Sequence, residues 1–289
     1  MNLENENVKT GLIMEGGAMR GMFTAGVIDV LLENDINFDG AAGISAGAVF
    51  GCNFVSKQIG RPLRYNMKYC NDPRYCSIRS WIKTGDLYGV DFCYTEIPQK
   101  LDVFDNETFT KNPTEFYVGA TDVNTGKCVY HKCVDGGEVD TKWMQASASM
   151  PVVSRPVEVD GYTLLDGGVA DSVPYRYMEE IGFNRNVIVL TQPDGYRKHK
   201  SKAQPIMNLL LHKYPVIAKT MANRYMEYNN EMEEIKQREE QGISFVIRPP
   251  EDLGIGKTEK DPAELERVYK IGRREATRQL QELKEFLQK

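Results

Sequence analysis

The sequence has no long hydrophobic run. No stretch of the 289 residues approaches the roughly 18 consecutive apolar residues that a membrane-spanning helix needs. The N-terminal segment MNLENENVKT also lacks the basic stretch and apolar run of an export signal. We therefore expect a cytoplasmic protein.

An excess of positive charge is missing as well. The chain has 36 Lys and Arg against 41 Asp and Glu, which gives a formal net charge of −5. Proteins that bind nucleic acid without sequence preference carry the opposite balance, because they must neutralise phosphates. We expect no nucleic-acid partner.

Cysteine motifs are absent too. None of the six cysteines belongs to a CxxC pair, and a chain of this length without an export signal keeps them as free thiols rather than as disulfides. Cys128 and Cys133 lack the usual zinc spacing, and only His131 lies near them. We expect no metal and no cofactor.

Alternating strand and helix patterns predict an α/β fold. Apolar residues make up 41% of the chain, enough for a sizeable core. KTGLIME (9–15) is typical of a buried strand, and a helix pattern follows it over 22–34. GAAGI and then SAGAVFGCNFVSK repeat this order, which favours parallel strands covered by helices. We expect one domain over residues 1–289, with a core at about 10–192 and a mostly helical region at about 205–289.

The later elements are predicted by turn residues and capping residues. They are two hairpins with turns at 124–126 and 160–161, a helix capped near Asp140 and stopped before Pro151, strands at 186–190 and 243–247, a long helix at 216–241, and one last helix that opens at Asp261 and Pro262.

One serine lies between two glycines at the end of a predicted strand. Residues 43–47, GISAG, fit the GxSxG pattern, in which the glycines permit a sharp turn that exposes the serine oxygen at the start of a helix. A plain strand-to-helix turn with Ser45 as the N-cap fits the same letters. Gly43, Ser45 and Gly47 are therefore candidates for a nucleophile and its turn, with the capping role left open.

A second glycine-rich turn, EGGAMRG (15–21), follows the first predicted strand. Such a loop can point backbone N–H groups into one concavity in front of a helix N-terminus, which suits an oxyanion or a phosphate. The GxxxxGK[ST] pattern fails because Met22 and Phe23 follow Gly21. The GxGxxG pattern fails because Ala18 stands where its second glycine belongs. An oxyanion hole is therefore favoured over a nucleotide site, with a purely structural turn as the alternative.

A carboxylate is a better candidate for the base than any histidine. LLDGGV (164–169) places Asp166 at the end of an apolar strand, and Gly167 and Gly168 leave room for another backbone or a ligand. A carboxylate within hydrogen-bond reach of a serine can accept its proton if an oxyanion hole stabilises the developing charge. An ordinary Asp-Gly-Gly turn is the alternative.

The three histidines sit in ordinary surroundings. His131 lies in a predicted strand and His199 in the basic loop YRKHKSK, where a solvated position is the simplest reading. His212 lies in an apolar helical stretch and is expected to pack in the core. None of them neighbours a glycine-rich segment.

Taken in this order, the three elements resemble the patatin-like phospholipases, lipid acyl hydrolases with bacterial members that use a Ser-Asp dyad without a catalytic histidine. That family has a glycine-rich oxyanion loop with an Arg, a GxSxG turn and a late DG[GA]; here these correspond to 16–21 with Arg20, 43–47 and 166–168. The run ASASMPVVSRPVEVDGYTLLDGGVADSVP is also similar to the family's approach to its aspartate. The resemblance spans about residues 10–192.

The resemblance implies a three-layer α/β/α fold with a mainly parallel central sheet and a lipid or ester substrate. It assigns Ser45 as the nucleophile and Asp166 as the base. It assigns the backbone of Gly16, Gly17 and Ala18 as the oxyanion hole.

The same resemblance gives Arg20 one of two roles, to steady the glycine loop or to face a substrate phosphate. The family usually has Asp where this chain has Glu15, and a third glycine where it has Ala18. Alanine resists positive φ, so this substitution bears on the conformation of the loop.

Two other functions stay open. A conventional α/β-hydrolase would use His199 or His212, but its serine turn would not come as early as residue 45, and no histidine-glycine oxyanion element precedes that turn. A non-catalytic protein that binds lipid or acyl chains on the same fold is the second alternative.

Peripheral contact with the inner membrane face is a further hypothesis. The basic loop 197–202 lies directly before the apolar stretch 206–211. A solvated loop beside a core helix is the simpler interpretation of the same residues.

Overall fold

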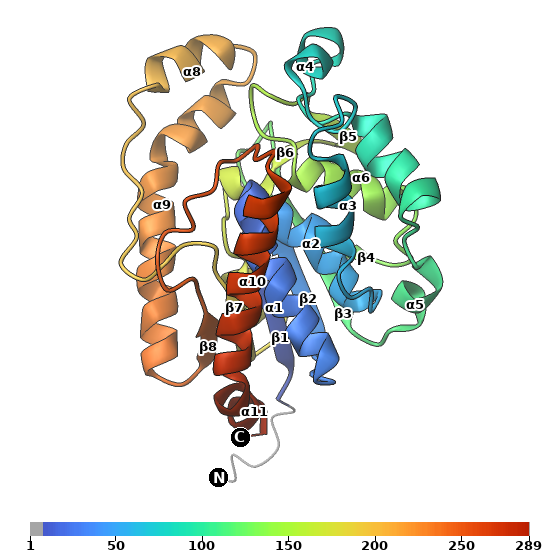
Figure 1. Ribbon diagram of the computed structural model, residues 1–289. Coiled ribbons are helices and arrows are strands. Elements are labelled where there is room, and N and C mark those ends of the chain that lie inside the picture. Colours follow the sequence, from blue (N-terminus) through green and yellow to red (C-terminus); the bar gives the residue numbers. More distant parts are fainter. Residues whose placement is uncertain (1–7, 289) are drawn as a thin grey trace.

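The computed structural model describes residues 8–288 and places eight strands in one sheet (Figure 1). Five neighbouring strands, in the order β3-β2-β1-β7-β8, run parallel, and the remaining three pair antiparallel. The strands are β1 (Thr10–Met14), β2 (Gly40–Ile44), β3 (Glu115–Asp122), β4 (Cys128–Cys133), β5 (Val157–Val159), β6 (Tyr162–Asp166), β7 (Arg185–Val189) and β8 (Ser244–Ile247).

Helices connect the parallel strands and cover the sheet. The α-helices are α1 (Gly21–Glu33), α2 (Ala46–Val55), α3 (Arg61–Tyr69), α4 (Ile78–Thr84), α5 (Asn106–Lys111), α6 (Glu138–Ser147), α7 (Tyr175–Glu180), α8 (Gln204–Leu210), α9 (Pro215–Glu240), α10 (Pro262–Arg278) and α11 (Leu280–Gln288). Two short 3-10 turns, η1 (Ala18–Arg20) and η3 (Gly167–Val169), and a π-helix, η2 (Phe92–Leu101), complete the set.

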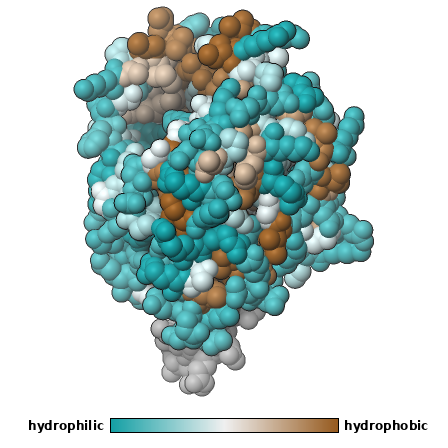
Figure 2. Space-filling model, viewed as in Figure 1, coloured by the Kyte–Doolittle hydropathy of each residue, from teal (hydrophilic) through white to brown (hydrophobic). Residues whose placement is uncertain are grey.

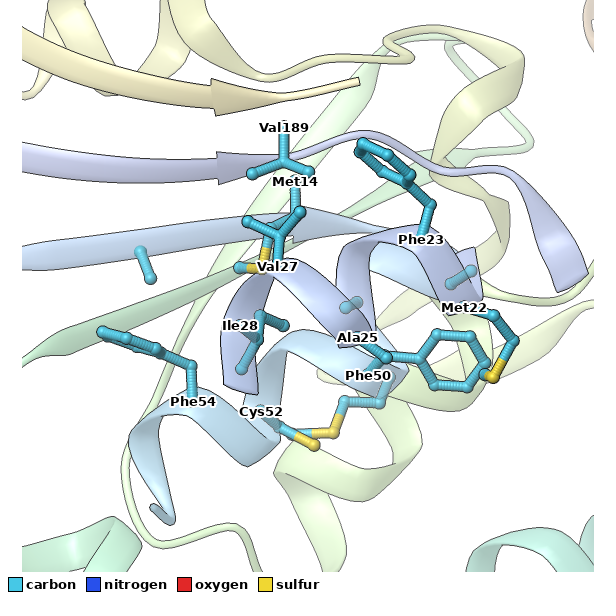
Figure 3. Packing of buried hydrophobic residues seen from close by; sticks show 14 of the residues in the cluster. Met14, Met22, Phe23, Ala25, Val27, Ile28, Phe50, Cys52, Phe54 and Val189 are labelled. Carbon is cyan, nitrogen blue, oxygen red and sulfur yellow. The ribbon is translucent and has the colours of Figure 1, made fainter. Parts of the chain in front are cut away.

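The parallel strands are apolar on both faces because helices cover both faces. Met14 of β1 and Val189 of β7 pack against Val27 of α1 in the larger core, with α2 beside it (Figure 3). Ile13, the neighbour of Met14, points the other way and packs in a separate cluster with Tyr175 of α7. The three-layer α/β/α fold with a mainly parallel sheet is therefore confirmed.

Most of the elements expected from the sequence pattern appear within two residues of their expected ends. The helix expected to be capped near Asp140 instead begins at Glu138, with Gly137 at its N-cap position. The Asp140 carboxylate is occupied elsewhere, because it accepts hydrogen bonds from three backbone N–H groups of the loop at 134–136. That loop, rather than the helix N-terminus, is what Asp140 stabilises.

The single last helix expected after Asp261 is wrong, because the chain bends at Gln279 and forms α10 and α11. The bend allows Leu283 and Phe286 of α11 to be buried, and the Phe286 ring lies 5.7 Å from the ring of Phe245 in β8. Apolar spacing continued through both helices, so the pattern gave no sign of the bend.

The C-terminal third of the chain is built into the layers of the fold. β8 extends the parallel sheet at its edge, and α10 lies along α1 (Figure 1). The two helices cross where glycines face each other: a Cβ on Gly26 would lie 2.1 Å from the carbonyl oxygen of Tyr269, and one on Gly272 would lie 2.0 Å from that of Phe23. Only glycine permits backbones to approach this closely.

The apolar stretch 206–211 is not a core helix. α8 has no buried residue, and within the stretch Leu211 alone is buried. His212, expected in the core, is exposed. Among residues 8–288, no helix combines the length and the apolar character that crossing a membrane requires.

Candidate active site

Ser45 occupies a strained turn between β2 and α2. Its φ of 54° and ψ of −119° are unusual for a residue with a side chain, and such a conformation costs about 1–3 kcal/mol. Gly43 and Gly47 make the turn sterically feasible, because a Cβ at either position would come within 2.3 Å of a backbone oxygen. The Ser45 side chain does not cap α2, so the interpretation of this serine as an ordinary N-cap is wrong.

Asp166 meets Ser45 across 121 residues of chain. The Ser45 hydroxyl donates a hydrogen bond of 2.8 Å to Oδ2 of Asp166, and both residues are buried. The other carboxylate oxygen accepts the Gly168 N–H at 2.8 Å. These two bonds hold the carboxylate with one oxygen aimed at the serine, the orientation in which it can take the hydroxyl proton.

Strand pairing along β3 brings the two residues together. β2 pairs with β3 up to Ile44 opposite Gly119, and β6 pairs antiparallel with the next residues of β3, starting with Asp166 opposite Ala120. Since β4 pairs with these same positions on the other edge of β3, β2 and β6 share one edge. They approach each other end to end, so the residue after β2 and the last residue of β6 lie side by side.

Ser147 of α6 supports the serine turn. Its hydroxyl accepts the Ser45 backbone N–H at 2.8 Å and donates to the Gly119 carbonyl at 2.6 Å. Both bonds are buried, so the loss of this hydroxyl would leave two backbone groups without partners. Ser147 is therefore a positioning residue for the turn.

The glycine-rich loop lies against Ser45. A Cβ on Gly16 would be 3.0 Å from the Ser45 Cβ, and Ala18 lines the same cavity as Ser45. The Gly16 N–H reaches the Ser172 carbonyl at 3.4 Å, whereas the N–H groups of Gly17 and Ala18 make no hydrogen bond within the described residues. N–H groups left free in a loop that contacts the serine turn are available to an oxyanion.

Ala18 adopts the left-handed conformation that its position in the loop suggested, with a φ of 49°. A glycine would adopt this backbone without penalty, whereas alanine carries roughly 1 kcal/mol of strain there. The loop thus keeps the expected shape despite the missing glycine.

Glu15 anchors the start of the glycine loop from below. It is buried, and its Oε2 accepts the Thr191 N–H at 2.6 Å while its Oε1 accepts the Tyr228 hydroxyl at 2.9 Å. Thr191 follows the end of β7, and Tyr228 lies on α9. The Glu15 carboxylate therefore connects the start of the loop to α9.

Two cationic side chains influence the ionisation of Asp166. Burial raises the pKa of Asp166 above its ordinary value, and the opposing influences are the Arg224 charge, the hydrogen bonds from Ser45 and Gly168, and the Lys257 charge. Arg224 extends from α9, and its Nε donates to the Gly168 carbonyl. Burial thus favours the protonated form of Asp166 while these partners favour its ionised form, a balance that suits a group that accepts and returns a proton.

Arg20, the arginine of the glycine loop, lies in η1. Its Nε is buried without a hydrogen-bond partner in the described part of the chain. The charge of Arg20 also contributes to the lowered pKa of Lys257, after burial and Arg224. Neither of the two roles expected for Arg20 is selected by these contacts.

No histidine contacts the dyad within residues 8–288. His131 forms a 2.7 Å hydrogen bond with Asp140 and stacks on Trp143 with ring centroids 4.9 Å apart. His199 and His212 are exposed. The Ser-Asp pair is thus formed without an imidazole between the two oxygens.

Three of the groups near His131 could together hold a metal ion. The donor atoms of His131, Cys133 and Asp140 lie within 4.8 Å of one another. The carboxylate of Asp140 is already shared among three backbone N–H groups and the imidazole, and burial raises the pKa of the Cys133 thiol well above its ordinary value. These partners fit a structural hydrogen-bond centre better than a set of ionised ligands.

A cavity of about 610 Å³ opens beside Ser45. Burial raises the pKa of Tyr75 and Tyr94 well above the ordinary value, so the phenols of its wall are neutral. The cavity is large enough, and apolar enough, for a flexible hydrocarbon chain. Its aromatic and apolar wall comes mainly from α3, η2 and their connections, with Tyr65, Tyr75, Tyr88, Tyr94, Ile97 and Phe104 as the main contributors.

Local sequence pointed to Ser45 and Asp166, which the structure brings into hydrogen-bond contact, but not to the residues around them. Ser147 stands in the motif run before Asp166, whereas no local pattern distinguishes Arg224 and Tyr228 from the other residues of the long helix. The cavity wall did leave a signal: eight of the 40 residues at 65–104 are aromatic, against 10% for the whole chain. Such a local concentration of aromatic side chains is typical of an apolar core or of a pocket wall.

Family models match two parts of the chain. A family model described as patatin-like phospholipase matches residues 12–178, and one described as a domain of unknown function, DUF6363, matches residues 214–288. The uncharacterized protein YjjU of Escherichia coli K12 is 26% identical, over 92% of this chain and 75% of its own length. Lysophospholipase NTE1 of Coccidioides immitis is 22% identical over 91% of this chain, but the chain spans only 17% of that protein.

Among solved structures, VipD from Legionella pneumophila aligns with a TM-score of 0.48 and 13% identity, over 95% of this chain and 67% of VipD. The family model, by contrast, matches more than half of the 289 residues and includes both Ser45 and Asp166. The chain belongs to the patatin-like phospholipase family.

Proposed function

We propose that this protein is a serine acyl hydrolase that cleaves lipid esters with a Ser45–Asp166 dyad. The observation that carries the proposal is the 2.8 Å hydrogen bond between the two side chains, formed beside free N–H groups of the glycine loop. Family membership and the lysophospholipase relatives favour a lipid ester over other esters.

In the first half of the reaction, the Ser45 Oγ attacks the ester carbonyl carbon while its proton passes to Oδ2 of Asp166. The carbonyl oxygen becomes an oxyanion and accepts hydrogen bonds from the Gly17 and Ala18 N–H groups. Collapse of this intermediate breaks the bond to the alcohol, which leaves with the proton from Asp166. The acyl group is then bound to Ser45 as an ester.

In the second half, a water molecule attacks the acyl-serine and gives its proton to Asp166. The same N–H groups hold the second oxyanion, and the proton returns to Ser45 as the fatty acid leaves. A single oxyanion donor contributes roughly 3 kcal/mol to lowering such barriers, so the loop matters nearly as much as the base.

The cavity supports an acyl chain as the group that is held during the reaction. Each methylene that moves from water into an apolar wall contributes about 0.8 kcal/mol, and the aromatic lining supplies such a wall. An acyl chain seated there would place its carbonyl carbon near Ser45, which lies at the same cavity.

Hydrolysis of a lysophospholipid and of a short nitrophenyl ester by purified protein tests the proposal. We expect Ser45→Ala to lose about 1000-fold or more of kcat with both substrates, and to lose labelling by a fluorophosphonate probe. Ser244→Ala is the matched control, because Ser244 is a buried serine of β8 that does not line this cavity, and its hydroxyl has no hydrogen-bond partner among residues 8–288. Unchanged turnover in Ser45→Ala would refute the mechanism.

The two alternatives predict different results. A conventional α/β-hydrolase would lose activity in the His199→Asn/His212→Asn double variant, whose substitutions lie at exposed positions. A non-catalytic binding protein would leave the fluorophosphonate probe unreacted in the wild type as well. We expect the double variant to be as active as the wild type and the wild type to be labelled.

A further inference from the structure

Two short helices at one end of the molecule present apolar side chains to solvent. α4 and α8 both lie at the end toward which the parallel strands run, and apolar surface gathers there (Figures 1 and 2). Neither helix buries a single residue. Of the 15 large apolar side chains exposed among residues 8–288, six belong to these two helices: Ile78, Trp81, Ile82, Ile206, Leu209 and Leu210.

Such helices are unusual in a water-soluble fold. A helix of seven residues gains its stability from an apolar face packed on the rest of the protein. In α4 and α8 the largest apolar side chains point outward instead, with Ile82 78% exposed and Leu209 72% exposed. We name these six residues the apolar end surface, and its exposure indicates that another apolar phase covers it.

The apolar end surface is attached to the element that holds Asp166. The indole of Trp81 donates to the Val152 carbonyl at 3.1 Å, and Val152 and Met207 of α8 pack on one cluster that contains Leu165 and Val169. Leu165 precedes Asp166 in β6. Whatever binds this surface therefore lies close to the dyad.

The surface also adjoins the cavity. Asp86 and Tyr88, which follow α4 closely in the chain, line the same cavity as Ser45. A hydrocarbon chain that leaves an apolar phase bound at α4 would therefore have a short path to the proposed acyl site.

Basic residues frame the apolar end surface. Residues 195–226 contain seven Lys and Arg and no Asp or Glu, in a chain whose net charge is −5. Arg197 pairs with Glu233 and Lys198 lies over the Tyr228 ring, so these two are engaged within the protein. The exposed cations of the frame, Arg79 and Lys83 on α4 and Lys200, Lys202 and Lys213 around α8, are available to a partner.

This combination of apolar and basic residues identifies the partner. We infer that α4 and α8 dock the protein on an anionic lipid bilayer, with the apolar end surface inserted at the interface and the lysines on the headgroups. A second copy of the chain fits less well, because a symmetric contact would oppose the basic frames of both copies. The inference goes beyond the proposed chemistry, since it concerns binding and not the dyad.

Vesicle co-sedimentation of the full chain tests the inference, with phosphatidylcholine alone compared with phosphatidylcholine containing one third phosphatidylglycerol. We expect about tenfold stronger partitioning onto the anionic vesicles, weakened by salt. The variant Ile82→Gln/Leu209→Gln should lose about tenfold of this binding or more, since it removes two inserted side chains. The matched control is Val134→Gln/Ile243→Gln, which changes exposed apolar residues elsewhere and should bind like the wild type.

Tryptophan fluorescence gives a second readout. The chain has two tryptophans, and Trp143 is buried while Trp81 is 40% exposed. Anionic vesicles should therefore shift the emission to shorter wavelength in the wild type and in Ser45→Ala, but not in Trp81→Phe. Persistence of the shift in Ser45→Ala separates docking from catalysis.

Three results would overturn the inference. The first is equal partitioning onto both vesicle types, and the second is unchanged binding by Ile82→Gln/Leu209→Gln. The third is a concentration-dependent dimer that disappears in the same variant while no vesicle binding occurs, which would assign the surface to a second copy. Ile82→Gln/Leu209→Gln should hydrolyse a soluble short-chain ester as fast as the wild type does, which verifies that this variant is folded.

Discussion

Residues 12–178, matched by the patatin-like model, hold Ser45, Asp166 and the glycine loop, whereas residues 214–288 hold none of the proposed catalytic groups. The second region nevertheless contacts the residues that hold the proposed catalytic groups. Arg224 donates to the turn after Asp166, Tyr228 donates to Glu15 under the glycine loop, and α10 lies along α1.

The first region therefore supplies the proposed reacting groups, and the second region supplies side chains that hold them in position. The family region has its proposed catalytic residues at strand ends and in tight turns, where the backbone conformation of a few neighbouring residues fixes their positions. The C-terminal region acts through long side chains from α9 and through the closely packed α1–α10 crossing. Its contribution should therefore appear mainly in stability and in pH dependence, with a smaller effect on turnover through the glycine loop, while substitutions in the dyad should appear mainly in turnover.

The largest effect is expected from Asp166→Asn in the family region. Loss of the base should lower kcat by about 10²- to 10⁴-fold in an ester hydrolysis assay, because the amide accepts no proton from Ser45. Glu158→Gln, an exposed acid on the neighbouring strand β5, should leave kcat unchanged. A variant that retained wild-type turnover would remove Asp166 from the mechanism.

The same substitution should stabilise the fold at alkaline pH. Burial raises the pKa of Asp166 in the folded state. The ionised carboxylate therefore destabilises the fold above this raised pKa. The destabilisation disappears below the pKa that Asp166 has in the unfolded chain. Thermal unfolding of Asp166→Asn should occur at higher temperature than in the wild type at about pH 8, and the gain should shrink toward about pH 4. A loss of stability at alkaline pH would contradict the burial argument.

A smaller effect, on stability, is expected where the two regions cross. In Gly272→Ala the new methyl group would collide with the Phe23 carbonyl and push α10 away from α1, at a cost of about 1–3 kcal/mol in the free energy of unfolding. Urea denaturation measures this cost. Gly256→Ala is the control, because a Cβ there meets nothing within 4 Å and φ is not positive. Equal stability of the two variants would mean that the helices are not held in this contact.

Tyr228→Phe should have a somewhat smaller effect on stability. It tests whether α9 supports the glycine loop. The lost hydroxyl leaves one buried oxygen of Glu15 without its donor, which costs about 1–2 kcal/mol of stability. Because Glu15 precedes the loop, kcat should fall with it, while KM for a short-chain ester changes little. Tyr225→Phe, on the same helix, provides the matched comparison in both assays.

The smallest effect is expected from Arg224→Gln, in the pH dependence. The Arg224 charge lowers the pKa of Asp166 against the larger opposing effect of burial, so its removal should raise that pKa further. Since the base acts only when ionised, the acid limb of the kcat/KM profile should move to higher pH. Lys236→Gln, an exposed cation farther along α9, should leave the limb in place. A shift of the limb to lower pH would contradict the assigned influence.

Local sequence sufficed for the candidate groups and for most of the elements around them. GISAG and LLDGGV are expected at strand ends because each follows or contains an apolar run that leads into glycines. The structure confirms this, since β2 ends at Ile44 and β6 ends at Asp166. The helix break at Gln279 and the exposure of His212 escaped prediction, since apolar spacing is the same on a buried helix and on one that faces outward.

The sequence by itself determined which turns are tight, which strands are apolar and where a serine and a carboxylate stand relative to glycines. These properties depend on sterics and side-chain periodicity over a few neighbouring residues. Only the tertiary structure decided that Ser45 and Asp166 share one edge of β3, that Arg224 and Tyr228 reach them from α9, and that α4 and α8 expose apolar faces at the same end. The reason is that strand register and helix packing join residues more than 50 positions apart, and no short stretch of the chain encodes such distances.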